Sequence, residues 1–167
     1  MIAAYADPPY PGHADRYKDH IDYDGEVDHA ELVNRLCAEF PDGWALHTAS
    51  TTLKQVLALC PNDVRIGAWV KPFGVFKPAV NPGYVWEPVI FRGGRRRTDR
   101  TEPTVRDWCS YPITLERGVV GAKPEGVCFW VFAMLGLRQG DVLMDLFPGS
   151  GAVSRAWDRW QQQLWVA

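Results

Sequence analysis

The stretch GDVLMDLFPGSGAV, residues 140–153, carries the pattern that decides the fold. An apolar strand over residues 142–144 runs into an acidic residue and a glycine-rich turn, and a helix is predicted over residues 152–160. In open α/β sheets ligands bind beyond the carboxyl ends of parallel strands, where glycines allow close approach to the backbone. The pattern is not the dinucleotide G-x-G-x-x-G, because Ser154 occupies the third glycine position. The stretch predicts a nucleotide-cofactor crevice; the alternative is a plain strand-to-helix turn.

A second informative stretch lies at the start of the chain. The apolar run over residues 2–6 predicts a short buried strand that leads directly into Asp7-Pro8-Pro9-Tyr10. A carboxylate accepts one amino proton, a stiff prolyl turn presents a carbonyl as a second acceptor, and an aromatic ring offers a face for a base. These groups favour a pocket for transfer to an exocyclic amine. The alternative is a Pro-Pro turn with a capping aspartate.

At these positions the chain resembles the DNA methyltransferases that modify adenine N6 or cytosine N4 with S-adenosylmethionine. Their catalytic motif, D/N/S-P-P-Y/F/W, matches residues 7–10, and their cofactor motif, D-x-F-x-G-x-G, matches residues 145–151. Their K-P segment before a helix matches residues 123–124. The catalytic motif precedes the cofactor motif, as in the permuted β group, and it is also similar to that of the adenosine methylases with a D-P-P-W motif.

The resemblance implies a fold, a cofactor and a set of site residues. The fold is a Rossmann-like methyltransferase sheet, mostly parallel with an antiparallel strand pair, and the cofactor is S-adenosylmethionine. The implied catalytic residues are Asp7, Pro8, Pro9 and Tyr10. The implied cofactor-binding residues are Asp145, Phe147, Gly149, Gly151, Lys123 and Pro124. Aspartate at the first motif position favours adenine over cytosine.

Composition agrees with one compact domain spanning residues 1–167. The chain is 47% hydrophobic and 23% charged, which suits a folded core and argues against disorder. No apolar run approaches the roughly 18 residues of a membrane span, and no basic leader precedes the first strand, so we expect a cytoplasmic protein. Four cysteines without a C-x-x-C pair and four histidines without convergent spacing indicate neither a disulfide framework nor a metal site.

Between the motifs, helical and strand patterns alternate in the rhythm of a parallel sheet. Helices are predicted over residues 27–40, 52–59 and 124–137, with Asp28 as the N-cap of the first. Strands are predicted over residues 44–48, 64–70 and 84–91. The short spacing of the last two strands predicts an antiparallel pair at the margin of the sheet.

The net charge of −2 provides no global basic field for nucleic acid, so local charge matters more. Five arginines fall within nine residues: Arg92, Arg95, Arg96, Arg97 and Arg100. Arginine forks match phosphate geometry, and Trp108 and Tyr111 downstream offer rings for stacking where a base leaves the helix. We therefore expect this arginine loop to contact DNA, or RNA, with a solvated charged loop as the alternative. Glu87 lies where related enzymes often carry a glutamate, but the sequence assigns it no role.

The cofactor half departs from the family pattern. An acidic residue normally follows the glycine turn by about 20 residues and binds the ribose hydroxyls. The sequence ends at Ala167, before that position, so the fold is expected to be truncated at its C-terminal cofactor half. Either a terminal carboxylate or partner chain completes the ribose site, or the chain is a degenerate relative. An uncovered sheet edge at this end also leads us to expect a homodimer or a partner chain.

The leading hypothesis is an adenine N6 DNA methyltransferase, of the restriction-modification kind, that transfers a methyl group in line to a flipped base. Three alternatives stay open: a catalytically weak or inactive nucleic-acid-binding relative, cytosine N4 methylation, and RNA adenosine methylation. A protein-glutamine methyltransferase is less favoured, because those relatives carry asparagine where Asp7 stands.

Overall fold

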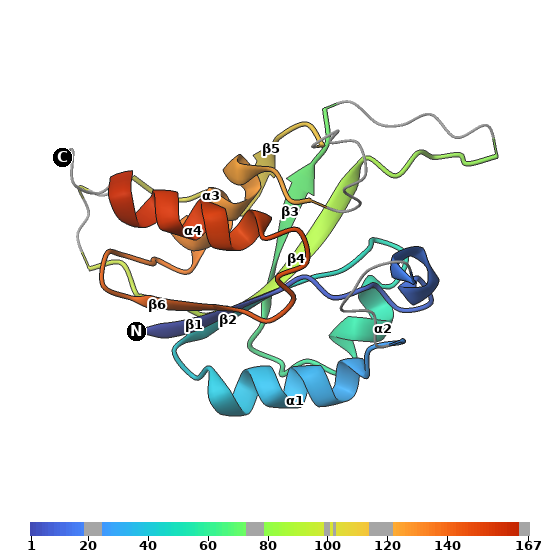
Figure 1. Ribbon diagram of the computed structural model, residues 1–167, viewed down its shortest axis with the longest axis horizontal. Coiled ribbons are helices and arrows are strands. Elements are labelled where there is room, and N and C mark those ends of the chain that lie inside the picture. The colour runs from blue at the N-terminus through green and yellow to red at the C-terminus, as the bar shows by residue number, and fades with distance from the viewer. Residues whose placement is uncertain (19–24, 73–78, 99–100, 102, 114–121, 164–167) are drawn as a thin grey trace.

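The computed structural model describes residues 1–18, 25–72, 79–98, 101, 103–113 and 122–163. Within them, one sheet has its strands in the order β5-β3-β4-β2-β1-β6 (Figure 1). The strands are β1 (Ile2–Ala6), β2 (Gly43–His47), β3 (Arg65–Val70), β4 (Trp86–Gly93), β5 (Trp108–Ser110) and β6 (Val142–Asp145). No helix in this part of the chain combines the length and the apolar character that crossing a membrane requires.

The sheet is mixed, as the sequence predicted. β1 runs parallel to β2 and to β6, and β3 runs parallel to β5. β4 runs antiparallel to both of its neighbours, β2 and β3. This strand lies inside the sheet and not at the margin where its spacing had placed it. Val89, Ile90 and Phe91 are all buried, so helices or loops cover both faces of β4, as an interior strand requires.

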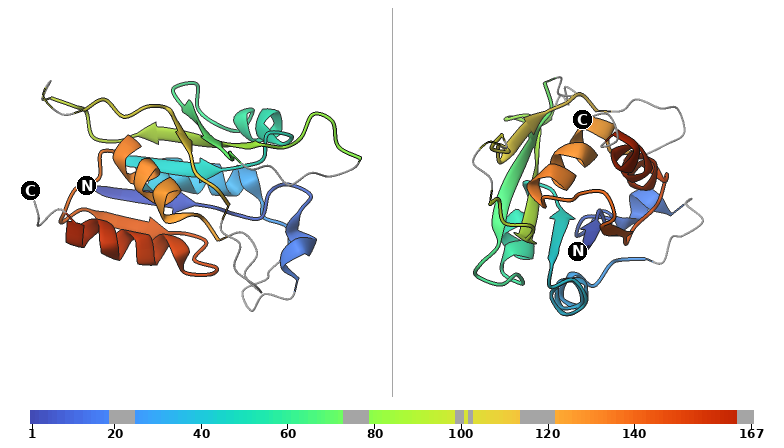
Figure 2. Two further views of the ribbon diagram at one scale, coloured as in Figure 1. Left: turned by 90° about the horizontal axis from the view of Figure 1, so that it is seen from above. Right: turned by 90° about the vertical axis from the view of Figure 1, so that its left-hand side faces the viewer.

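Helices cover both faces of the sheet (Figure 2). α1 (His29–Glu39) and α2 (Leu53–Leu57) pack on one face, and α3 (Glu125–Met134) and α4 (Ala152–Gln163) pack on the other. The short 3₁₀ helix η1 (Ala14–Tyr17) lies between β1 and α1. The predicted cap of α1 is confirmed, because the Asp28 carboxylate accepts the N–H groups of Ala30 and Glu31 at 2.9 and 3.0 Å.

The strand order reverses between β1 and β6: the chain continues from β1 to β2 on one side, whereas β6 pairs with β1 on the other side. Tyr5 of β1 lies opposite Asp145 of β6 in their parallel ladder. The helix that follows β1 contributes to the core on one face, whereas the helix that follows β6 contributes to the core on the other. In open α/β folds ligands bind at such a switch point, outside the carboxyl ends of the strands. The fold therefore places the candidate site at the end of the sheet where β1 and β6 finish, beyond Ala6 and Asp145.

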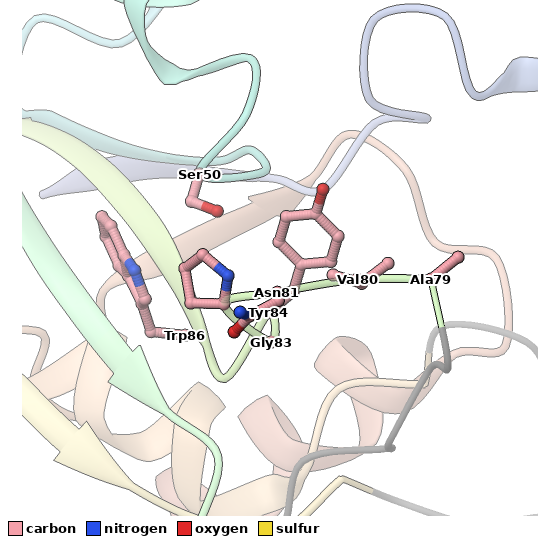
Figure 3. Close-up of a pocket in the computed structure, with 8 residues that line it drawn as sticks. Ser50, Ala79, Val80, Asn81, Gly83, Tyr84 and Trp86 are labelled. Atoms are coloured by element: carbon pink, nitrogen blue, oxygen red, sulfur yellow. The ribbon is translucent and has the colours of Figure 1, made fainter.

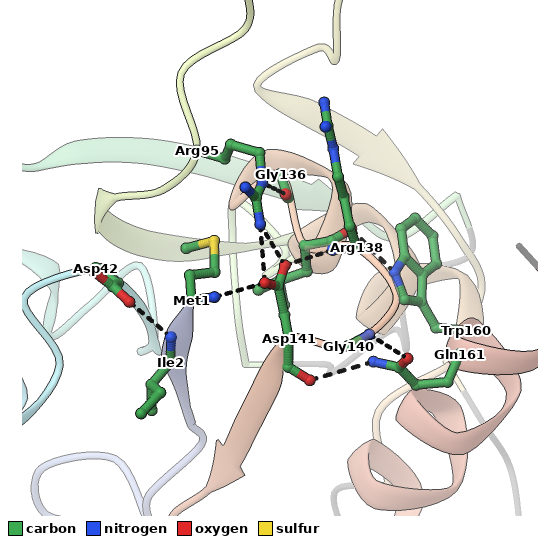
Figure 4. Close-up of polar contacts among 11 residues, drawn as sticks. Met1, Ile2, Asp42, Arg95, Gly136, Arg138, Gly140, Asp141, Trp160 and Gln161 are labelled. Atoms are coloured by element: carbon green, nitrogen blue, oxygen red, sulfur yellow. Dashed lines mark hydrogen bonds and ion pairs between the residues drawn. The ribbon is translucent and has the colours of Figure 1, made fainter.

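At the opposite end of the sheet, where β1 and β6 begin, Asp141 makes several polar contacts (Figure 4). Asp141 is the residue before β6. Its side chain is 6% exposed and accepts the ammonium of Met1 at 2.6 Å, the guanidinium of Arg95 at 2.8 and 2.9 Å, and the N–H of Arg138 at 2.7 Å. Burial raises the pKa of this carboxyl, but these hydrogen bonds outweigh burial and hold the pKa below its usual range. Asp141 thus ties together the starts of β1 and β6 and the segment after β4.

Asp141→Asn should lower the free energy of unfolding by about 1.5–3 kcal/mol at pH 7, the usual value of hydrogen bonds to a charged group. Because the folded-state pKa is depressed, the carboxylate stabilises the fold above its unfolded-state pKa, and this stabilisation is lost as pH falls through the folded-state value. Urea titrations at several pH values should show the gap between variant and wild type closing with acid. The exposed Asp158 provides the control Asp158→Asn, and equal stability of the two variants at pH 7 would contradict the assignment.

Candidate active site

The sheet brings the two sequence motifs together at the switch point. Asp7 follows the last residue of β1, and Asp145 is the last residue of the neighbouring β6. The N–H of Leu146 donates to the carbonyl of Tyr5 at 3.0 Å, which continues the ladder to the edge. The Asp-Pro-Pro-Tyr segment and the glycine turn therefore begin side by side, although 138 positions separate Asp7 from Asp145 in the sequence.

Asp7 forms an ion pair with a lysine that is distant from it in the sequence. The ammonium of Lys123, two residues before α3, lies 2.8 Å from Asp7 Oδ2 and donates to the hydroxyl of Tyr10 at 3.3 Å. The Lys123 side chain is only 7% exposed. Its Nζ also lies 5.7 Å from the centroid of the Tyr10 ring, so one buried cation contacts the first and last residues of the motif.

A second carboxylate, Glu87 of β4, completes this buried charge cluster. Its Oε2 accepts the Tyr10 hydroxyl at 2.9 Å and lies 3.7 Å from Lys123 Nζ, while its Oε1 accepts Lys71 Nζ at 2.5 Å. The two lysines and two carboxylates balance in charge when all are ionised. Sequence reasoning gave Glu87 no role and missed Lys71. Their meeting depends on the antiparallel β3–β4 ladder, in which Trp69 lies opposite Glu87.

Burial and charge act on these groups in opposite directions. Burial raises the pKa of Asp7 above its usual range and outweighs the lowering effect of the Lys123 ammonium. Burial also raises the pKa of Glu87, but Lys123 and Lys71 outweigh it and leave that pKa below its usual range. Burial lowers the pKa of Lys123, but Asp7, Tyr10 and Glu87 outweigh it, so this lysine stays protonated. The Lys123 ammonium thus favours the ionised form of both carboxyls.

The glycine turn after β6 is built on Asp145. This carboxylate accepts the N–H of Phe147 at 3.3 Å and the hydroxyl of Ser154 at 3.2 Å. Gly149 and Gly151 have φ angles of +43° and +72°, which side-chain-bearing residues rarely adopt. A Cβ on Gly149 would meet only the carbonyl oxygen of Phe147, at 3.8 Å, so the backbone there borders open space. The turn can accept a ligand close to the main chain.

Two stacked aromatic rings lie in the core near the carboxyl ends of β1 and β2. His47, the last residue of β2, is fully buried and stacks on Tyr5 with ring centroids 5.1 Å apart. Neither ring nitrogen of His47 has a hydrogen-bond partner among the described residues, and burial lowers its pKa well below the usual range. His47 is thus a neutral core residue. In the described ranges no three histidine, cysteine, aspartate or glutamate side chains gather where they would hold a metal ion, and His20 lies outside those ranges.

A surface hollow of about 320 Å³ opens at the same edge of the sheet (Figure 3). Trp86 begins β4, whose start lies beside the carboxyl ends of β2 and β3, and its neighbour Glu87 belongs to the charge cluster. Tyr84 and Trp86 are 53% and 37% exposed. The lining residues are Ser50, Ala79, Val80, Asn81, Pro82, Gly83, Tyr84 and Trp86. The hollow therefore offers exposed aromatic rings at the same end of the sheet as the motif residues, whereas the side chain of Glu87, the next residue of the strand, points to the other face.

The structure does not bring the arginine loop to this edge. Arg92 lies near the end of β4, at the edge of the sheet opposite Asp7, and its Nε donates to both Asp63 oxygens at 2.8 and 3.0 Å. Arg95 pairs with Asp141 there, and Arg97 donates to the Thr104 hydroxyl. Arg96 is exposed, and Arg100 lies outside the described residues. Contact of these arginines with phosphate stays a prediction, and Arg92 and Arg95 already serve as ion-pair partners.

The remaining predicted residues have these positions. Pro8 is buried and Pro9 is partly buried in the turn after β1. Phe147 packs at the border of the core that α1 covers. Pro124 is the N-cap residue of α3, and the neighbouring Lys123 points its ammonium at Asp7 and Tyr10. The cofactor-binding roles of Phe147, Lys123 and Pro124 stay predictions.

Comparison with known proteins identifies the fold. No protein-family model and no curated protein matches the chain. Among solved structures, the M1.HpyAVI-SAM complex is similar with a TM-score of 0.62 and 15% identity, over 96% of this chain and 79% of that one. M1.HpyAVI is similar with a TM-score of 0.57 and 16% identity, over 95% of this chain and 76% of that one. The Rossmann-like methyltransferase fold predicted from the sequence is therefore confirmed.

Proposed function

We propose that this protein is an S-adenosylmethionine-dependent DNA methyltransferase that modifies N6 of a flipped adenine. One observation carries the proposal: the Tyr5–Asp145 pairing sets an Asp-Pro-Pro-Tyr segment beside a glycine turn at the switch point of the sheet. A similar fold occurs in a protein solved with SAM bound. An acceptor for an amine and a turn for a nucleotide cofactor thus lie side by side at the carboxyl ends of neighbouring strands.

The residues present fit this cofactor. The turn after β6 leaves open space at Gly149, and the N–H groups at the start of the twelve-residue helix α4 face the same turn. Asp145 and Ser154 bond to each other and hold the turn from within. When bound, S-adenosylmethionine supplies an activated methyl group on its sulfonium centre.

The chain's own residues position the amine. Asp7 Oδ2 is engaged by Lys123, which assigns Oδ1 to accept one amine hydrogen, and the Pro8 carbonyl accepts the other. The Tyr10 ring, held through its hydroxyl by Glu87, stacks on the base. These contacts would hold the amine nitrogen for direct transfer of the methyl group that the cofactor would supply: the N–C bond would form as the S–C bond breaks, S-adenosylhomocysteine would leave, and the amine would release one proton to water. Such orientation is worth about 7–11 kcal/mol of barrier. The role we assign to Asp7 is that of a hydrogen-bond acceptor that orients the amine.

The aromatic hollow supports a nucleic-acid substrate. Stacking on exposed rings is the common way in which proteins hold unpaired bases, and every base offers a face for it. Trp86 presents such a ring at the same edge as Asp7, next in sequence to Glu87 of the charge cluster. We assign this hollow to a base that neighbours the flipped adenine.

Transfer of tritiated methyl groups from S-adenosylmethionine to DNA, RNA and protein, measured side by side, tests the proposed function. Labelling of DNA at adenine N6 is expected. Labelling of RNA, or of cytosine N4, would show that the proposed substrate is wrong. No labelling of any acceptor would overturn the assignment of the protein as an enzyme.

Asp7→Ala should abolish methyl transfer, because it removes an acceptor that acts on the amine in the transition state. Cofactor affinity should stay within a few-fold of wild type, as measured by calorimetric titration. An active Asp7→Ala protein would show that the Asp-Pro-Pro-Tyr segment is not the catalytic element.

Gly149→Val should abolish cofactor binding, since it forces a β-branched residue into a positive φ at the open side of the turn. Gly140→Val is the matched control: Gly140 also has a positive φ, +82°, and nothing within 4 Å of its Cβ position, but it precedes the other end of β6. The control should bind the cofactor normally. Equal loss in both folded variants would indicate general strain and not a cofactor site.

Two variants separate the possible nucleic-acid contacts. Trp86→Ala should weaken binding to single-stranded DNA by roughly 5- to 150-fold, the worth of one stacked base, without changing its salt dependence. Arg96→Ala with Arg97→Ala, which leaves the Arg95–Asp141 pair intact, should flatten the slope of log affinity against log salt by roughly 0.7 per lost contact on a single strand, or 0.9 on duplex. Fluorescence anisotropy at several salt concentrations measures both. An unchanged slope would indicate a solvated arginine loop, and unchanged affinity for Trp86→Ala would exclude the hollow.

A further inference from the structure

We propose that Lys123 is a positioning residue that fixes the Asp7 carboxylate and the Tyr10 ring in the arrangement that the reacting amine requires. This inference rests on the proposed function and gives a purpose to a lysine that the sequence motif implied for cofactor binding.

The contacts of Lys123 point to Asp7 and Tyr10. Its ammonium lies 2.8 Å from Asp7 Oδ2 and donates to the Tyr10 hydroxyl at 3.3 Å. An ammonium has three donors, and a side chain that is 7% exposed needs partners in the protein for its charge. Asp7 and Tyr10 supply two of these partners, and Glu87, at 3.7 Å, supplies the opposing charge on the third side.

The same arrangement explains Glu87. This carboxylate accepts a hydrogen bond from the Tyr10 hydroxyl and so fixes the direction in which that hydroxyl donates. Glu87 is itself held by an ion pair with Lys71 at 2.5 Å. Tyr10 is thus fixed at its hydroxyl by one donor and one acceptor. Lys123 links both motif residues to a single rigid element, the N-terminal end of α3, so a shift of α3 would move the acceptor and the stacking ring together.

The charged groups around Asp7 determine the direction in which its pKa changes when the charge of Lys123 is removed. Lys123 faces it as the cation, and Glu87, Tyr10, Tyr5, Asp145 and Cys128 face it as groups that are neutral or negative. Burial raises the pKa of Asp7 and Lys123 lowers it. Without the lysine charge, Asp7 would hold its proton to higher pH and lose its acceptor role over that range.

The test compares Lys123→Met, which keeps the length of the side chain and removes its charge, with Lys123→Arg, which keeps the charge. In Lys123→Met, kcat should fall by about 10- to 100-fold, the scale expected when a reacting group is displaced, while the Kd for S-adenosylmethionine stays within a few-fold. The acid limb of the pH–rate profile should move to higher pH, and Lys123→Arg should return it toward wild type. A large loss of cofactor affinity with an unmoved acid limb would place Lys123 at the cofactor instead.

A second measurement is independent of activity. Carbon NMR titration of the Asp7 carboxyl in the cofactor-free protein should show a higher pKa in Lys123→Met than in wild type, and a pKa close to that of wild type in Lys123→Arg. Lys71→Met is the matched control, because it removes the same charge from the cluster at Glu87 without contacting Asp7, and it should move the Asp7 titration less. An unchanged Asp7 titration in a folded Lys123→Met protein would overturn the inference even where methyl transfer is confirmed. A shifted titration in a protein that transfers no methyl group would instead count against the proposed function alone.

Discussion

The pairing of β1 with β6 is the constraint on which the rest of the structure depends. β1 lies between β2 and β6, and Ala3, Ala4, Tyr5 and Ala6 are fully buried. Small alanines let helices approach both faces of this strand, while Tyr5 fills the space under α3 beside Phe132. Because the ladder is parallel, the strand ends coincide at one edge, and the two motifs meet there without any loop having to reach across the sheet.

The buried charges follow from that geometry. Taking a lysine and two carboxylates out of water is unfavourable unless each charge is compensated by close partners. Here the partners come from four separated parts of the chain: the segment after β1, the segment after β3, β4, and the residue two positions before α3. Glu87 lies within a strand, and Asp7, Lys71 and Lys123 each lie within two residues of the end of a strand or helix, so the sheet and α3 determine where these charges meet. Removal of any one member leaves an uncompensated charge on another.

Local sequence patterns predicted much of this fold. The cap at Asp28, the helix that it begins, the first strand and the strand–turn–helix around Gly149 all depend on residues within a few positions of one another, and all occur close to where they were predicted. The interior position of β4 was missed, since its pairing with β2 joins residues more than forty positions apart. The lysine–carboxylate cluster was missed for the same reason. Lys71 and Glu87 are unremarkable in sequence and gain meaning only when β3 and β4 are aligned.

The order of the motifs along the chain also bears on how the protein reaches its folded state. β1 comes first in sequence order among the described strands, yet one of its two neighbours in the sheet, β6, comes last, and the contact between Met1 and Asp141 spans 140 positions. Contacts so distant in sequence require a large loop to close before they stabilise anything. Until residues 142–145 have been synthesised, β1 keeps an unpaired edge, and such an edge favours pairing with other chains. In a chain of this topology, association through the open side of β1 therefore competes with folding until β6 has paired with it.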